Sequence, residues 1–300
     1  MAHLLVGTED GLVEVDGSRR RELDGHRVTA LSGAGWAIVD GTTVMHRIPP
    51  GGWHKWLEFG DAGSGHLTCL APRGDEVFVG TSGGQLMRHR RDESPHLQPV
   101  PSFDTVDGRQ QWHAVGSSKP YVRSITATAD GVLLANVHVG GIPRSTDGGQ
   151  TWHPTIDVDA DVHQVRAHPE RPELVLAAAA VGLCVSRDGG VTWTVQTEGL
   201  HATYCRAVAV AGDAMLVSAS TGPFTDRGAI YRRSLDGDGP FERVSDWLDG
   251  NVDSGRLVAF SDQVAFGDPD GRLHFSDDYG ATWTVRDDVP PVTALAYSRT

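Results

Sequence analysis

Apolar residues recur along the chain in short runs that are separated by turn residues, and long stripes with helical spacing are few. The 37 glycines and 16 prolines are suited to tight turns between these runs. The pattern therefore predicts an all-β chain of many short strands. With 300 residues and 39% hydrophobic content, the chain can bury a large core.

One eight-residue pattern, S-x-D-x-G-x-T-W, occurs three times. The copies span residues 145–152, 186–193 and 276–283, and a decayed copy at 234–241 has Phe in the Trp position. The aspartates of the four copies follow one another at intervals of 41, 48 and 42 residues. This period is the length of a four-stranded propeller blade, so the repeat predicts a β-propeller.

The residues of this pattern indicate a turn rather than a catalytic site. Ser and Asp two positions apart can bond backbone groups across a turn, and Gly adopts the positive φ that the reversal needs. We expect Thr to begin the next strand and Trp to fill the space between neighbouring blades. The motif then lies between the third and the outermost strand of a blade, far from the axis.

On these motifs the chain resembles the BNR/Asp-box propeller superfamily, which includes sialidases, sortilin-type receptors, xyloglucanases and photosystem II assembly-factor-like proteins. The stretch 168–178 followed by 182–186 is especially similar to the last three branches. The resemblance implies a propeller fold for the whole chain. Its motifs specify architecture rather than activity.

A short apolar signature marks the innermost strand of each unit and gives the number of blades. Its seven copies lie at 28–31, 67–70, 122–125, 162–165, 205–208, 255–258 and 292–295. The last copy is too near the C-terminus for a full blade, and the missing strands are at 4–8, 11–15 and 20–23. We therefore predict one seven-bladed propeller of four-stranded antiparallel blades over residues 1–300. Its last blade combines residues 1–24 and 290–300, which closes the ring.

Two insertions interrupt the period, at residues 92–120 and 221–228. The first ends at residues 110–113, which we expect to form a delayed outer strand. The second lies between a second and a third strand. Long loops on a rigid scaffold often carry function, so both are candidate interaction sites.

The second position of the inner-strand signature carries the candidate chemistry. Its residues are Thr29, Thr68, Arg123, His163, Arg206, Arg256 and Thr293. Inner strands line the axial channel of a propeller, so we expect Arg123, Arg206 and Arg256 to hold a small carboxylate or phosphate there. Further ligand-binding candidates near this level are His66, His138, His201 and Asp253. In the alternative reading, Asp161 and Asp253 neutralise the arginines as salt bridges.

If the protein is an enzyme, His163, Tyr204 and Tyr121 are the proton-transfer candidates. The resemblance to sialidases implies an arginine triad and a tyrosine nucleophile, but those enzymes have six blades. Their R-I-P motif opens an early strand, whereas Arg47-Ile48-Pro49 here ends a third strand. The rival functions are a non-catalytic scaffold for a protein partner and a glycan-processing or glycan-binding role.

Net charge restricts the classes of partner that we expect, and the cysteines indicate the redox environment. The net charge of −13 repels phosphate backbones, so we expect neither nucleic acid nor an anionic membrane as a partner. Cys69, Cys184 and Cys205 lack metal-ligand spacing and are predicted to be buried free thiols in a reducing cytoplasm. No apolar run is long enough to span a membrane, and the N-terminal residues do not have the pattern of a secretory signal.

Metal binding is the weaker interpretation of the histidines. His66, His138, His163 and His201 would be the ligands, but no H-x-H or H-x-x-x-H pair supports them, and nearby arginines oppose a divalent cation. We therefore assign no metal ligand, and no cofactor is required by the sequence.

Overall fold

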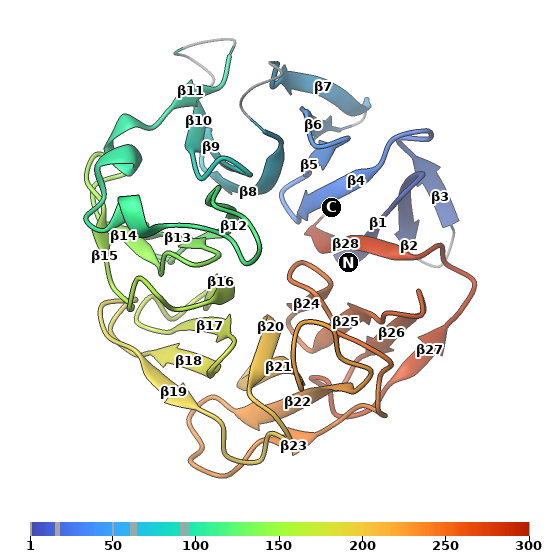
Figure 1. Cartoon of the computed structure of the whole chain (residues 1–300). Coiled ribbons are helices and arrows are strands. Elements are labelled where there is room, and N and C mark those ends of the chain that lie inside the picture. Colours follow the sequence, from blue (N-terminus) through green and yellow to red (C-terminus); the bar gives the residue numbers. More distant parts are fainter. Residues whose placement is uncertain are drawn as a thin grey trace.

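The computed structural model describes residues 2–15, 19–49, 51–60, 65–90, 93 and 96–299. Its strands form seven four-stranded antiparallel sheets, arranged as blades around a central axis (Figure 1). The innermost strands are β28, β4, β8, β12, β16, β20 and β24, in ring order. The seven-bladed propeller predicted from the repeats is confirmed.

The strands of the first four blades have the following bounds. The closing blade contains β28 (Val292–Arg299), β1 (Ala2–Thr8), β2 (Gly11–Val15) and β3 (Arg19–Glu22). The second contains β4 (Val28–Ser32), β5 (Trp36–Val39), β6 (Thr43–Ile48) and β7 (Gly52–Glu58), and the third β8 (Leu67–Arg73), β9 (Glu76–Thr81), β10 (Leu86–Arg90) and β11 (Gln98–Pro99). The fourth contains β12 (Val122–Ala127), β13 (Leu133–Val137), β14 (Pro143–Ser145) and β15 (His153–Pro154).

The remaining three blades complete the ring. They contain β16 (Val162–Ala167), β17 (Val175–Ala179), β18 (Gly182–Ser186) and β19 (Thr194–Gln196), then β20 (Tyr204–Ala211), β21 (Ala214–Ser220), β22 (Gly228–Ser234) and β23 (Glu242–Arg243). The last has β24 (Leu257–Phe260), β25 (Gln263–Gly267), β26 (Leu273–Ser276) and β27 (Thr284–Arg286). Two 3₁₀ helices, η1 (Pro101–Thr105) and η2 (Arg109–Gln111), lie in the first insertion.

Both ends of the chain form one blade, as predicted (Figure 1). The C-terminal strand β28 pairs antiparallel with β1, through Leu4 and Tyr297, Leu5 and Ala296, and Val6 and Leu295. This pairing removes the sheet edge that β1 would otherwise present. The ring is therefore closed by contacts between residues almost 300 positions apart.

The Asp-box turns have the same hydrogen bonds in each intact copy. In the first copy, the Asp147 carboxylate accepts hydrogen bonds from Gln150 N, Thr151 N and Thr151 Oγ1, at 2.6–3.0 Å. Ser145 Oγ accepts one from Gly149 N at 2.8 Å. The expected role of Thr needs correction, because β15 begins two residues later and the Thr hydroxyl instead bonds the Asp.

The aromatic residue of each box packs between blades, as expected. Trp152 is buried in a cluster with Phe78 and Leu86 of the preceding blade. In the decayed copy Phe241 fills the same place, and Asp236 pairs instead with Arg171 and Arg187. Loss of the turn therefore leaves the packing function intact.

The box aspartates predict a specific loss of stability in acid. The pKa of Asp278 is about 2, against an ordinary 3.8, mainly because of its hydrogen bonds with Thr282, and Asp147 also has a pKa of about 2. A lowered folded pKa stabilises the protein above pH 3.8, and that stability is lost as the pH falls through about 2. In denaturant unfolding we expect Asp278→Asn to be less stable than wild type near pH 6, with the gap narrowing toward pH 2. A gap that is independent of pH would contradict this prediction.

The first insertion differs from the expectation. The outer strand of the third blade is β11, which pairs with β10 through Met87 and Pro99, rather than residues 110–113. The chain continues into η1 and η2 because Phe103 and Trp112 pack against each other, with ring centroids 5.3 Å apart, and close this side of the core. Hydrophobic packing, rather than strand pairing, thus places residues 110–113.

Two further predictions can be compared with the structure. Cys69, Cys184 and Cys205 are buried free thiols, and burial raises the pKa of Cys69 to about 12. Within the described part of the chain, no helix is long and apolar enough to cross a bilayer.

The Arg47 side chain forms an ion pair with Glu14 on the neighbouring blade, at 2.8 Å, so it joins two blades.

Candidate functional site

A β-bulge explains why the second position of the inner strands stands apart. In six of the seven blades the pairing of the innermost strand shifts register at this position, so the residue is left outside the ladder. The bulged residues are Thr29, Thr68, Arg123, His163, Arg206 and Thr293. A bulge redirects a side chain from the regular in-and-out alternation of a strand. Direction toward the axis therefore has to be established for each residue separately.

Several bulged side chains tie one blade to the next. Thr68 Oγ1 donates to the carbonyl of Val122 on the following inner strand, and Thr293 Oγ1 donates to that of Val28. His163 makes the same kind of contact through Nδ1, which lies 2.6 Å from the carbonyl oxygen of Cys205. Thr68, Thr293 and His163 at this position therefore bond neighbouring blades together. The longer side chains of Arg123 and Arg206 make other contacts.

Arg123 lies across the axial channel. Its guanidinium lies 3.2 Å from His138 Nε2 and 3.4 Å from Ser254 Oγ, which belongs to the loop before β24, three blades away. It lines a narrow cavity of about 100 Å³ together with Thr29, Thr68 and other inner-strand residues. Burial lowers the pKa of Arg123. Within the described chain, no carboxylate forms an ion pair with it.

The other two predicted arginines are placed differently. Arg206 forms an ion pair with Asp253, and its guanidinium carbon lies 5.4 Å from the centre of the Tyr204 ring. Burial lowers the pKa of Arg206, but Asp253 and Tyr204 together raise it by more, so the net shift is upward. Arg256 precedes β24, and its backbone N–H donates to the carbonyl of Asp253 at 3.0 Å. The structure brings Arg123 and Arg206 near the same carboxylate, that of Asp253, but neither Arg206 nor Arg256 lines the narrow cavity.

A second group of polar residues lies beside Arg123. Asp161 Oδ1 is 3.1 Å from His138 Nε2 and 3.2 Å from His163 Nε2, and the rings of His163 and Tyr204 are 4.8 Å apart. Burial raises the pKa of Asp161, but the contacts with His138 and His163 together lower it by more, so the net shift is downward. Burial lowers the pKa of His163. Asp161 is therefore a carboxylate with two imidazoles against one of its oxygens.

Backbone bonds between blades place this group. The N–H of Val162 donates to the carbonyl of His138 at 2.9 Å, so the end of β13 lies against the start of β16. This contact brings His138 of one blade to the two residues that flank Val162 in the next. Asp161 precedes the strand and His163 occupies its bulge. The cluster is thus made by the junction of two blades.

The remaining candidates lie apart from this cluster or at its edge. Tyr121 packs against His66, with ring centroids 5.9 Å apart, and burial raises the pKa of Tyr121. His201 belongs to another contact, 2.8 Å from Tyr231 Oη. Asp268, directly after β25, is buried and bonded to Arg272 and His274. The tight hairpin between β25 and β26 uses its carboxylate to satisfy the turn.

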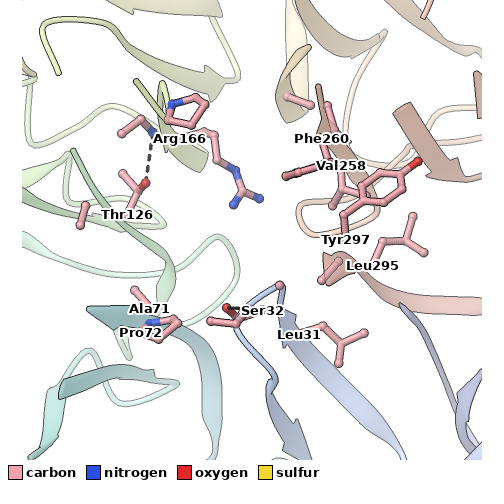
Figure 2. A pocket seen from close by; sticks show the side chains of 18 of the residues that line it. Leu31, Ser32, Ala71, Pro72, Thr126, Arg166, Val258, Phe260, Leu295 and Tyr297 are labelled. Carbon is pink, nitrogen blue, oxygen red and sulfur yellow. Dashed lines mark hydrogen bonds between the residues drawn. The ribbon is translucent and has the colours of Figure 1, made fainter. Parts of the chain in front are cut away.

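A wide cavity opens at the opposite ends of the inner strands. It has a volume of about 630 Å³ and is lined by the residue that directly follows each four-residue inner-strand signature. Those residues are Ser32, Ala71, Thr126, Arg166, Ala209, Ala259 and Ala296. Six are small, which leaves the space open, and the seventh is an arginine. Figure 2 shows the Arg166 side chain pointing into this cavity.

Arg166 is isolated in its surroundings. Of the described residues that line the cavity, it alone carries a charge, and Val258, Leu295 and Tyr297 line the wall across the cavity from it (Figure 2). Burial is the cause of its lowered pKa, and the described residues give its guanidinium no ion-pair partner. It also lines the narrow cavity that contains Arg123. Arg166 was not among the predicted site residues, although the position that follows each signature has a small residue in six copies and arginine in this one.

Comparison with known proteins agrees with the architecture. Residues 144–154 match the BNR/Asp-box repeat. No curated protein matches the chain. Among solved structures, the computationally designed protein Ika8 has a TM-score of 0.64 at 13% identity, covering 99% of this chain and 87% of that one.

Two natural propellers are similar in fold. YCF48 bound to D1 peptide has a TM-score of 0.60 at 15% identity, covering 88% of this chain and 86% of that one. The WD40 β-propeller domain of Doa1 has a TM-score of 0.62 at 11% identity, covering 94% and 84%. The TM-scores establish a shared fold, and at identities this low they establish the fold alone. The ligand has to be argued from the geometry of the site.

Proposed function

We propose that this chain, a β-propeller with BNR/Asp-box repeats, binds a small carboxylate or phosphate compound in its axial channel. The observation that carries the proposal is the Arg166 guanidinium, which lies in an apolar-lined cavity without an acid partner among the described residues. Arginine cannot shed its charge, and a buried charge without a partner is costly. An anionic ligand would compensate that charge.

The cavity also fits the size and character of such a ligand. Small-molecule sites commonly enclose about 300–1,000 Å³ and combine apolar walls with a few polar groups. Here Leu31, Val258 and Leu295 supply apolar surface, while Ser32 and Thr126 supply hydroxyl groups. The planar fork of Arg166 suits a carboxylate or a phosphate. The favoured ligand is therefore an organic anion with an apolar part.

Arg123 extends the same proposal along the axis. It and Arg166 come from adjacent inner strands and line one narrow cavity, so an extended dianion could meet both. The proposed anion site therefore includes Arg123, one of the three arginines predicted from the sequence, together with Arg166. If the bound compound is also transformed, His163, Tyr204 and Tyr121 remain the predicted proton-transfer groups.

Thermal unfolding with matched salts tests this function. Phosphate, succinate and benzoate, each compared with chloride at equal ionic strength, should include at least one anion that raises Tm by a few degrees when present at about 100 times its Kd. Arg166→Gln should lose that rise. Without added anion the variant should be at least as stable as wild type, because a partly buried charge without an ion-pair partner has been removed.

The control is Arg286→Gln, which removes a guanidinium from the exposed outer strand β27. It should respond to anions as wild type does, because general salt effects act on the whole surface. An equal anion response in wild type and Arg166→Gln would contradict the proposal.

A protein partner is the second candidate, favoured by one surface feature. Phe224 is fully exposed in the 221–227 insertion. The ring centre of the partly exposed Trp247 lies 4.0 Å from the guanidinium carbon of Arg227 and 4.6 Å from that of Arg243. Aromatic and arginine side chains are enriched at interface hot spots. The YCF48 structure with its bound D1 peptide shows that a propeller of this fold can hold a peptide.

A further inference from the structure

Three metal-ligating atoms converge at the junction of the fourth and fifth blades. His138 Nε2, Asp161 Oδ1 and His163 Nε2 all lie within 4.8 Å of one another. The two imidazole nitrogens are 3.1 and 3.2 Å from the carboxylate oxygen. Tetrahedral ligands held about 2.1 Å from a zinc ion lie about 3.4 Å apart, so the distances from the two imidazole nitrogens to the carboxylate oxygen need little adjustment to bind one.

The hydrogen bond of His163 determines which of its nitrogens is available. Nδ1 lies 2.6 Å from the carbonyl oxygen of Cys205, and a carbonyl can only accept, so Nδ1 carries the proton. Nε2 of the neutral ring then presents a lone pair toward Asp161. A histidine that donates its other N–H to a backbone carbonyl is the usual arrangement for a metal ligand.

The contact between His163 and Asp161 is otherwise unexplained. The His163 side chain is fully buried, and neither its Nε2 nor Asp161 Oδ1 has a hydrogen-bond partner among the described residues. At 3.2 Å these atoms are close but not aligned for a hydrogen bond. Two acceptors facing each other in a buried site repel, and a cation between them would remove that repulsion.

His138 supplies a third lone pair, which in this structure faces the Arg123 guanidinium. Its Nε2 lies 3.2 Å from a guanidinium nitrogen of Arg123, and a guanidinium can only donate. Nε2 of His138 therefore accepts, and cannot also donate to Asp161. Arg123 also lines the narrow axial cavity, and a bound metal ion would compete with its guanidinium for the lone pair of His138.

We propose that His138, Asp161 and His163 bind one divalent transition-metal ion, with zinc and cobalt(II) as suitable probes. Two imidazoles and one carboxylate suit these ions better than magnesium or calcium, which prefer oxygen ligands. Three protein ligands leave at least one coordination position for water or an anion. The inference does not depend on the ligand proposed for the Arg166 cavity.

Titration of tag-free, metal-stripped protein with cobalt(II) chloride tests the site. We expect one ion per chain, with visible absorption bands of nitrogen-coordinated cobalt that added zinc abolishes. Asp161→Asn should weaken binding by about tenfold or more. Because the new amide can donate to a histidine lone pair, this variant should remain folded, with a Tm at or above that of metal-free wild type.

Two further variants separate the site from surface binding. His66→Gln removes an exposed histidine outside the cluster and should leave cobalt affinity unchanged. Arg123→Gln removes the competing cation and should increase affinity several-fold. Absence of stoichiometric binding would overturn the proposal. So would equal affinity in wild type and Asp161→Asn, or a loss of binding in His66→Gln as large as that in Asp161→Asn.

Discussion

A chain that ends at Val289 is expected to lose cooperative folding. The deleted strand β28 carries Val292, Leu295 and Ala296, all buried, and forms the inner edge of the closing blade. Burial of each Val or Leu contributes about 1.5–3 kcal/mol, and the deletion also exposes β1 as an open edge. A whole domain is stable by only about 5–15 kcal/mol. Thermal unfolding followed by circular dichroism should show no sharp transition.

Contacts with both neighbouring blades add to this expected loss. Thr293 donates to Val28 on one side, and the N–H of Leu295 donates to Gly255 on the other at 2.9 Å. The matched control moves residues 290–300 to the N-terminus, joined to β1 by a short turn. Arg299 pairs with Ala2, so a hairpin can make this connection. The relocated chain should regain the transition, and a truncated chain that melts near the wild-type Tm would contradict the role of β28.

Trp152→Ala is expected to cost about 3–5 kcal/mol of unfolding free energy. The indole is 5% exposed, packs edge-on against Phe103 with centroids 5.2 Å apart, and donates from Nε1 to the carbonyl of Gly149 at 3.2 Å. Truncation leaves a cavity between two blades that the rigid sheets cannot collapse to fill. Denaturant unfolding measures the loss through the midpoint at unchanged slope.

Trp247→Ala is the matched control for that measurement. Trp247 is 42% exposed and packs against His201 and the guanidiniums of Arg227 and Arg243. Its loss should cost less than about 1 kcal/mol. Similar losses of unfolding free energy in the two variants would contradict a special role of Trp152 in the packing between blades.

The candidate site could be read from the sequence only in part. The second-position column identified Arg123, His163 and Arg206, which the structure places near one another with Asp253. The column did not indicate where each side chain points, because a bulge breaks the alternation from which direction is inferred. Arg256 precedes its strand and lines neither axial cavity.

Arg166 was missed for a related reason. Its position in the regular part of β16 gave no sign of special chemistry, and its isolation depends on the small residues that six other blades contribute. The pairing of His138 with Asp161 likewise depends on how two blades meet. Distances between blades are not encoded in the period of any one of them.

The sequence alone determined the blade number, the turn chemistry and the closure by both ends. The blade number and the turn chemistry follow from contacts within one repeat unit of about 40 residues, where alternation, glycine conformation and turn hydrogen bonds act locally. Closure follows from counting strands, because the last inner strand at the C-terminus lacks the three partners that the N-terminal strands supply. The tertiary structure decided which polar side chains reach the axis, which are neutralised, and where three acceptors meet without a donor among them. Those outcomes depend on side chains from blades far apart in sequence, whose charges and lone pairs interact only after the ring has closed.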